Sequence, residues 1–449
     1  MFKKQHILFI ACIVLASCSN ESIPEGDWFV TFPSTSIDIR IATPTTISAQ
    51  IDAKGASLTE KWKLQSKTAD VDCGFLIQEQ TATSITLTIP GDTDSRCADE
   101  LTLTLTLTED GTRQTETPLT LSVIPTPDRI TSFTEQAGNP QPDIQTCPAW
   151  DCLNHSDPTL GRLPSGELAI WFAAGGDRST EKPVVGRAVQ HQEIWELDTD
   201  PVMLPTDAEA EVWDTVRETP SVRWNATANA WDMWYLGYNI SFFDDPAIGQ
   251  AQSLDADGTK WPRPSAPIYR PKADQWDESF LTSPGAVLGS DGTWRLYYTG
   301  ASFARNSGLM SVGVLTSKDG ETWEPHANNP VFEGTVGQWD ASIIDPHVQF
   351  IGGRYVMWYS ALAGQLQDDT PISVGVATSE DGFTWKRIQQ TPVIAPTVNT
   401  WTDFRVLDVE VFPQANGSLL MVGYATSNIA PNPSFPDFKP GRIGFWVSH

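Results

Sequence analysis

Acidic residues stand at the entrances of several short apolar segments after residue 150 of the sequence. Asp157 and Asp345 are each followed by Pro and then by an apolar run, as in "DPTLGRL" and "DPHVQF". Aligning the five comparable segments places these residues at one level: Asp157, Thr219, Ser283, Asp345 and Asp408. Because Thr and Ser serve at two of the positions, the backbone does not require an acid there, and the three Asp residues are candidates for a site. Carboxylates in close proximity raise one another's pKa, which suits a proton donor beside an ionised partner.

The expected site includes polar residues that neighbour these positions in the sequence. We assign four carboxylates to acid–base or nucleophilic chemistry: Asp157, Glu218, Asp345 and Asp408. We assign six further residues to substrate binding: His155, Arg217, Ser283, His347, Arg405 and Glu410. The two arginines either orient a substrate and set carboxylate pKa values or only neutralise an acidic surface. The two histidines either hold a water molecule or a metal ion or are satisfied in the core. No metal site or cofactor is assigned, and a bound calcium ion or water molecule stays open.

Positioning these residues requires a repeated scaffold, and the sequence contains one. Trp-Asp recurs from Trp150 onward and ends in the shifted form Trp401-Thr402-Asp403, with the Trp residues 63, 63, 63 and 62 positions apart. Each unit contains segments typical of four strands, so five units predict a five-bladed β-propeller whose inner-strand entrances line the mouth of an axial tunnel. The Asp of each pair recurs in every unit and is interpreted as scaffold that caps a turn before the inner strand: Asp151, Asp214, Asp277, Asp340 and Asp403.

The two ends of the repeat region predict how the ring closes. The last unit ends in "IGFWVSH" and lacks a fourth strand, whereas "RITSFTEQAGNP" precedes the first Trp-Asp pair. We therefore expect a strand at residues 129–135 to pair beside residues 443–448, which leaves no open sheet edge. In this interpretation the propeller spans residues 127–449.

The first 126 residues predict an export signal and a separate domain. Residues 1–17 contain two lysines and a short apolar run, which is typical of a signal peptide. They end in "LAS" before Cys18, which resembles a lipobox with Cys18 as the lipidated N-terminus; a plain signal peptide is the alternative. Residues 18–27 form a tether, and alternating segments such as "LTLTLTLTEDG" predict an immunoglobulin-like β-sandwich at residues 28–126. The fold class is therefore all-β.

The remaining cysteines fit an exported chain. Cys12 leaves with the signal peptide and Cys18 carries the lipid, so four remain: Cys73, Cys97, Cys147 and Cys152. We expect two disulfides, Cys73 with Cys97 and Cys147 with Cys152, because an even number in an exported protein is typical of bridges. The spacings lack the close pairs of a zinc site.

The propeller region resembles the five-bladed propeller glycosidases, similar to glycoside hydrolase families 43 and 32 and including arabinanases, β-xylosidases, invertases and levansucrases. The resemblance rests on the five units, on the Asp-Pro of the first inner strand and on text such as "ISVGVATSEDGFTWKR"; it covers residues 128–449, about 70% of the chain. It implies that Asp157 is the base or nucleophile. In that group a second carboxylate lies on the third blade and a Glu acid on the fourth, where this chain has Ser283 and Asp345. Glu218, on the second blade, is an acid outside that pattern.

Two functions follow as expectations. The first is a lipid-anchored glycoside hydrolase with Asp157 as base or nucleophile and Asp345 or Glu218 as acid, aided by Asp408. The second is a carbohydrate-binding surface lipoprotein without catalysis. The net charge of −27 repels nucleic acid and anionic lipid headgroups but does not penalise a neutral sugar. We expect a glycan partner, no nucleic acid, membrane contact only through the lipid, a monomer, and a location in the cell envelope at the outer membrane of a Gram-negative bacterium.

Overall fold

The computed structural model describes the chain in separate ranges. Between residues 29 and 124 it describes nine strands, and beyond them the following segments: 130–140, 154–175, 183–192, 194–204, 212–239, 245–289, 291–305, 307–351, 354–367, 370–414, 418–428 and 441–448. Cys18 and the four cysteines of the expected disulfides, Cys73, Cys97, Cys147 and Cys152, lie outside the described residues. Among the residues that the structure describes, no helix has the length and apolarity needed to cross a membrane.

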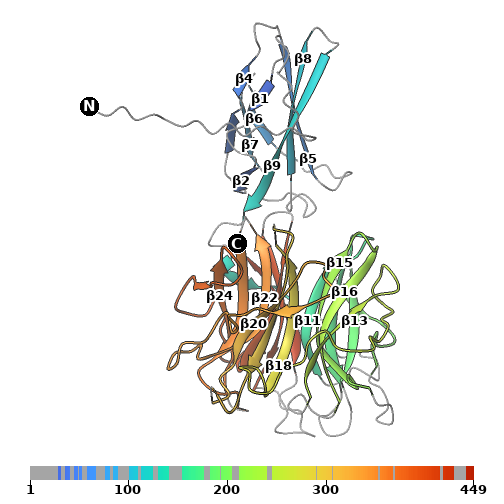
Figure 1. Ribbon diagram of the computed structural model, residues 1–449, viewed down its shortest axis with the longest axis vertical. Helices are drawn as coiled ribbons and strands as arrows, with labels where there is room; N and C mark the ends of the chain where they lie inside the picture. The colour runs from blue at the N-terminus through green and yellow to red at the C-terminus, as the bar shows by residue number, and fades with distance from the viewer. Residues whose placement is uncertain are drawn as a thin grey trace, which may run out of the picture.

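The chain from β10 (Phe133–Glu135) onward is a five-bladed β-propeller, as the repeat predicts (Figure 1). Blade 1 consists of β11 (Asn154–Arg162), β12 (Leu168–Gly175), β13 (Val184–His191) and β14 (Ile194–Leu197). Blade 2 consists of β15 (Val216–Asn225), β16 (Ala230–Tyr238) and β17 (Ala247–Gln252), and blade 3 of β18 (Phe280–Leu288), β19 (Trp294–Ala301), β20 (Ser311–Ser317) and β21 (Glu324–Pro325). Blade 4 consists of β22 (Ser342–Ile351), β23 (Arg354–Leu362), β24 (Ser373–Ser379) and β25 (Lys386–Arg387). In blade 2 the expected fourth strand is reduced to a single bridge between Ile248 and Tyr269.

Blade 5 closes the ring with a strand from the beginning of the propeller region. It consists of β26 (Arg405–Pro413), β27 (Leu419–Thr426), β28 (Arg442–Ser448) and β10 (Phe133–Glu135). β10 pairs antiparallel with β28, so the expected closure is confirmed. Asn139 then exchanges two side-chain hydrogen bonds with the backbone of Phe445, at 2.8 and 3.0 Å, as Asn329 does with Val314 in blade 3. The closing segment therefore reproduces the fourth-strand contacts of a sister blade.

Of the five Trp-Asp aspartates interpreted as scaffold, Asp151 lies outside the described residues, and Asp214 and Asp277 have partners beyond the expected turn. Asp214 and Asp277 are fully buried and accept hydrogen bonds from the hydroxyls of Tyr235 and Tyr298 on the second strand of the same blade, at 2.8 and 2.9 Å. In each blade the tyrosine ring lies against a glycine of the third strand, where a Cβ would come within 2.2 Å of Tyr235 or 2.7 Å of Tyr298: Gly249 and Gly313. Asp403, in contrast, accepts the backbone N–H of Asn428. These contacts hold the strands of a blade together.

The nine strands before the propeller form two larger sheets and one pair. They are β1 (Phe29–Thr31), β2 (Ser36–Arg40), β3 (Thr45–Ser48), β4 (Gln50–Asp52), β5 (Leu58–Ser66), β6 (Leu76–Gln80), β7 (Ser84–Thr88), β8 (Leu101–Glu109) and β9 (Arg113–Ile124). One sheet has the order β2-β9-β8-β5, another β3-β7-β6, and β1 pairs with β4. On β8, Leu103 and Leu105 are buried whereas Thr104 is partly exposed, which is the expected alternation. The immunoglobulin-like assignment of residues 28–126 stays a prediction.

We predict that Gly300→Ala destabilises the propeller by about 1–3 kcal/mol, because overpacking a filled core costs that much. A Cβ at Gly300 would lie 2.6 Å from the Trp276 ring and 2.7 Å from Asp277 Cβ. The matched control is Gly364→Ala, where no heavy atom lies within 4 Å of the added Cβ. Urea unfolding of the two variants measures the difference, and an equal effect of both would contradict this packing role.

Candidate active site

Each inner strand carries a β-bulge at the same place, near its start. The strand register is broken there in β11, β15, β18, β22 and β26. One residue in each bulge has a left-handed backbone: Asp157 (φ 53°), Thr219 (48°), Ser283 (49°), Asp345 (50°) and Asp408 (46°). A non-glycine residue in this conformation costs about 1–3 kcal/mol, and bulges re-aim side chains. The structure therefore brings together at one level the five residues that the sequence alignment grouped.

Hydroxyl groups from the preceding blade support two of these bulges. The backbone N–H of Asp345 donates to Thr299 Oγ1 at 2.9 Å, and that of Asp408 donates to Ser360 Oγ at 2.8 Å. Thr299 and Ser360 occupy the same register position on the second strand of blades 3 and 4, opposite the residue just before the bulge. Each of these two bulges is thus held by a hydroxyl group of the preceding blade, which fixes the direction of the Asp345 and Asp408 carboxyl groups.

Asp157 and Asp408 form a hydrogen-bonded carboxyl pair. Burial raises the pKa of Asp408 well above its usual range, and the negative charges of Asp345 and Asp157 raise it further. Burial also raises the pKa of Asp157, but hydrogen bonds from Asp408 and Ser156 oppose this increase, the latter at 2.9 Å. Because these hydrogen bonds favour the charged form of Asp157, Asp408 retains the proton and Asp157 ionises first.

Asp345 is buried at 8% exposure and is held by Ser283. Ser283 Oγ donates to Asp345 Oδ1 at 2.6 Å, which connects the bulges of blades 3 and 4 directly. Burial raises the pKa of Asp345 to about 6, against the lowering effect of the Ser283 hydrogen bond and with a further increase from the charge of Asp157. At the bulge of blade 3, Ser283 therefore serves as a hydrogen-bond donor to the carboxyl group of Asp345.

Glu218 lies one residue before the bulge of blade 2 and is partly exposed. Its Oε2 accepts a hydrogen bond of 3.0 Å from the hydroxyl of Tyr238, on the second strand of the same blade. Burial raises the pKa of Glu218 to about 7, and the charge of Asp157 contributes to the increase. At neutral pH both the protonated and the ionised form of Glu218 are therefore present.

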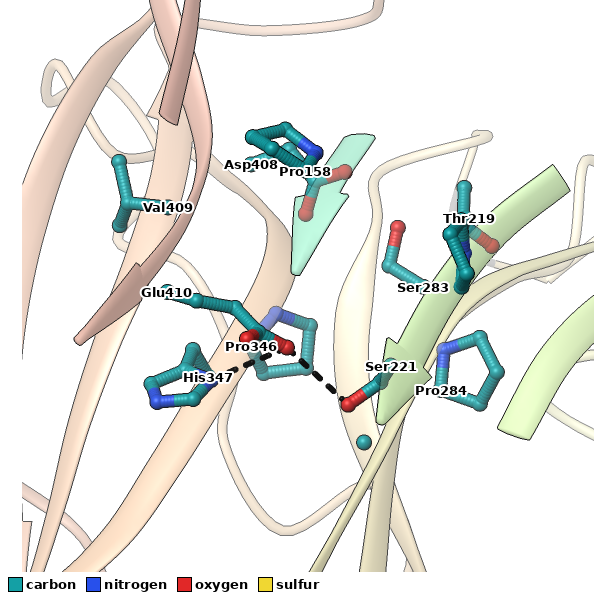
Figure 2. Close-up of a pocket in the computed structure, with 12 residues that line it drawn as sticks. Pro158, Thr219, Ser221, Ser283, Pro284, Pro346, His347, Asp408, Val409 and Glu410 are labelled. Atoms are coloured by element: carbon teal, nitrogen blue, oxygen red, sulfur yellow. Dashed lines mark hydrogen bonds and ion pairs between the residues drawn. The ribbon is translucent and has the colours of Figure 1, made fainter. Parts of the chain in front are cut away.

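A second ring of residues lies two positions further along the inner strands. It consists of Thr159, Ser221, Gly285, His347 and Glu410. Figure 2 shows Glu410 and His347 close together, with Ser221 hydrogen-bonded to Glu410 and Asp408 at a different height in the same pocket. His347 Nε2 lies 3.2 Å from the carbonyl oxygen of Val411, and burial lowers the His347 pKa to about 4.

Three of the expected binding residues have partners in the protein scaffold. Arg217 is buried and its guanidinium donates to the carbonyl oxygen of Leu204. Arg405 donates to the carbonyl oxygens of Thr370 and Gln367, at 2.9 and 2.6 Å. His155 is 1% exposed and its ring packs edge-on against Phe172, with centroids 5.1 Å apart. Ser283, His347 and Glu410, in contrast, line the same pocket as Asp408.

Sequence reasoning missed two tyrosines near the carboxylates. Tyr238 binds Glu218, and Tyr424 on β27 has its pKa raised by burial and by the charges of the three bulge aspartates. Both occur in second strands, whose aromatic residues are otherwise core, so the sequence has no signal that separates them. In the described part of the chain, no three His, Cys, Asp or Glu side chains are grouped as a metal site requires.

Comparison with known proteins agrees with this fold. No protein-family model matches the chain. Two uncharacterized proteins of Mycobacterium tuberculosis strains are 31% identical over 128 residues, which is 28% of this chain and 42% of each relative. Among solved structures, a putative glycosidase from Bacteroides thetaiotaomicron has a TM-score of 0.53 at 16% identity, covering 70% of this chain and 97% of that protein. A putative glycoside hydrolase from Parabacteroides distasonis has a TM-score of 0.53 at 16% identity, covering 71% and 96%.

A further similar structure comes from work on the GH130 family of mannoside phosphorylases, which contains glycoside hydrolases that target β-1,2-mannosidic linkages in Candida mannan. Its TM-score is 0.52 at 16% identity, covering 71% of this chain and 93% of that protein. The chain has the five-bladed propeller fold of these glycoside hydrolases. The resemblance stated from the sequence is confirmed at the level of the fold.

We predict that Ser283→Ala raises the pKa of Asp345 above about 6, because the lost hydrogen bond favours the charged form. The folded pKa of Asp345 already exceeds its ordinary value of 3.8, so its contribution to stability declines as pH rises from about 4 to about 6. In the variant this decline continues to higher pH, and the loss relative to wild type reaches about 1.5–3 kcal/mol at pH 8 but is smaller at pH 5.

Thermal unfolding between pH 5 and 8 measures this difference. The control is Ser253→Ala, which removes a buried hydroxyl whose partners are the backbone of Trp231 and Asp255. Its effect should be the same at every pH. If the loss of thermal stability in Ser283→Ala is equally independent of pH, the hydroxyl does not influence the pKa of Asp345.

Proposed function

We propose that the chain is a glycoside hydrolase that cleaves a poly- or oligosaccharide at the propeller mouth. Asp157 is the base or nucleophile and Glu218 the proton donor. The observation that carries the proposal is the difference between these two neighbouring carboxyl groups. Burial raises the pKa of both groups, to about 7 for Glu218, but only at Asp157 do hydrogen bonds from Asp408 and Ser156 favour the charged form. Glycosidic bond cleavage requires one ionised carboxylate and one protonated carboxylic acid on either side of the bond.

Glu218 fits the acid role better than Asp345 does. Asp345 is 8% exposed and is already bound to Ser283, whereas Glu218 is partly exposed. A proton donor must reach the leaving-group oxygen of the substrate, and the more accessible group satisfies that condition. In this proposal Asp345 and Asp408 act on Asp157 through charge and hydrogen bonding. The similar fold of proteins named glycoside hydrolases supports the substrate class, a glycan.

We also propose that the protein is exported and anchored in the cell envelope through lipid on Cys18, as a monomer. The sequence pattern of residues 1–18 supports the export and the anchor. The test expresses the full-length chain and Cys18→Ala in a Gram-negative host and follows detergent-phase partition and incorporation of labelled fatty acid. Label in both variants, or in neither, would contradict the anchor at Cys18.

We predict that Asp157→Asn keeps the fold and lowers kcat by about 10²–10⁴-fold, the range for loss of a general base. Asn tolerates a left-handed backbone, so the φ of 53° is not an obstacle. Glu218→Gln should lower kcat comparably on natural glycans but much less on aryl glycosides with good leaving groups, which need no proton donor. In the wild type, kcat/KM should decline as pH rises through about 7, because the acid must be protonated.

A screen of the wild type against a glycan panel provides the substrate for these assays, and circular dichroism verifies the fold of each variant. Full activity of Asp157→Asn would refute the assignment. A wild type that binds a glycan but cleaves none would replace the hydrolase with a carbohydrate-binding lipoprotein.

A further inference from the structure

Glu410 lies on β26, two residues after Asp408, and its carboxylate is bound by protein donors. Oε2 accepts hydrogen bonds from Thr159 Oγ1 at 2.8 Å and from the backbone N–H of Leu160 at 3.0 Å. Oε1 accepts one from Ser221 Oγ at 3.1 Å. Thr159 and Leu160 belong to blade 1, Ser221 to blade 2, and Glu410 itself to blade 5. One side chain therefore connects three inner strands that are up to 251 residues apart in the sequence.

A residue of blade 4 also lies near the Glu410 carboxylate. Blade 3 has a glycine at this level, so no side chain of blade 3 enters the hydrogen-bond network. His347 Nδ1 of blade 4 lies 3.7 Å from Glu410 Oε1. Blade 3 presents Gly285 at this level, and a Cβ there would be 3.4 Å from Ser221 Oγ. Figure 2 shows Glu410, His347 and Ser221 directed toward one another in the axial pocket.

Every strand that Glu410 contacts carries a carboxylate of the candidate site. Thr159 follows Asp157 by two residues, Ser221 follows Glu218 by three, and His347 follows Asp345 by two. Because residues so close on a strand move together, the span of the Glu410 side chain sets how far apart the carboxylates above it lie. A base and an acid must keep a defined separation, and a misplacement of 1 Å costs about 10²-fold in rate.

We propose that Glu410 is a positioning residue: its hydrogen bonds brace the inner strands of blades 1, 2 and 5 on the axis, it lies beside His347 of blade 4, and it sets the separation of Asp157 and Glu218. The sequence alone suggested that Glu410 contacts the substrate, and in this proposal it does not. The kinetic consequence rests on the proposed function. The structural consequence, a fixed carboxyl separation, does not depend on that function.

The surroundings of Glu410 determine which replacement preserves the brace. The titratable groups that face it are Asp408 on its own strand and His347 on β22; β11 and β15 present the hydroxyl donors Thr159 and Ser221 and the Leu160 N–H. Burial raises the pKa of Glu410 to about 7. Gln reproduces the protonated form, with an oxygen to accept from Thr159 and Leu160 and an NH2 to donate to Ser221. Glu410→Gln is therefore the conservative variant, and Glu410→Ala removes the brace.

Steady-state kinetics below each melting temperature compare wild type, Glu410→Ala and Glu410→Gln. We expect Glu410→Ala to lose about 10–100-fold in kcat with a smaller change in KM, and Glu410→Gln to stay within about threefold of wild type at its optimum pH. The matched control is Asp232→Asn, at a buried carboxylate that accepts hydrogen bonds from Asn225 and Gln252 at 2.9 and 2.8 Å, on the second strand of blade 2. It should lower the melting temperature and leave kcat and KM unchanged.

Crystal structures of the same variants provide a readout without activity. The separation of the Asp157 and Glu218 carboxyl carbons should change in Glu410→Ala and return to the wild-type value in Glu410→Gln. If the wild type cleaves no glycan, the proposed function fails. The separation of the two carboxyl carbons then tests the positioning role of Glu410 by itself. An unchanged separation in Glu410→Ala, or equal kcat losses in Glu410→Ala and Asp232→Asn, overturns it. If Glu410→Ala does not fold, Ser221→Ala removes one donor and is measured in the same way, with a smaller expected loss.

Discussion

The bulge near the start of each inner strand is the constraint on which the rest of the mouth depends. It places one residue per blade in a left-handed conformation, with φ between 46° and 53°, and it does so at the same height in all five blades. A regular strand would alternate its side chains between two faces, whereas the bulge breaks this alternation and re-aims the residue. Where that residue is Asp, as in blades 1, 4 and 5, buried carboxyl groups are forced into one small volume.

The electrostatics of the site follow from this crowding. Several buried carboxyl groups cannot all ionise side by side, so their protonation states separate. Asp408 retains its proton next to Asp157, Asp345 is held by Ser283, and the pKa of Glu218 is about 7. Protonated and ionised carboxyl groups are therefore available together near neutral pH.

The scaffold and the site occupy different parts of each blade. The buried Asp214 and Asp277 bind tyrosines of their own blade, whereas the backbone N–H groups of Asp345 and Asp408 bind Thr299 and Ser360 of the preceding blade. Blade stability thus depends on contacts within a blade, and the geometry of these two bulges on contacts between blades. This separation explains how Thr219 and Ser283 take the place of Asp at equivalent bulges in the same fold.

The sequence by itself determined the blade number, the closing strand and the ring of five mouth residues, because all of these depend on a period that is visible along the chain. It did not determine which neighbours point into the pocket. Arg217 and Glu218 are adjacent in the sequence, yet Arg217 binds the carbonyl of Leu204 and Glu218 lies beside Asp157, since successive strand residues face opposite sides. It also did not reveal the bulge, the Tyr238 and Ser283 hydrogen bonds or the partners of Glu410. Those depend on the register between strands and on contacts between blades, up to 251 residues apart for Glu410, which only the closed ring brings together.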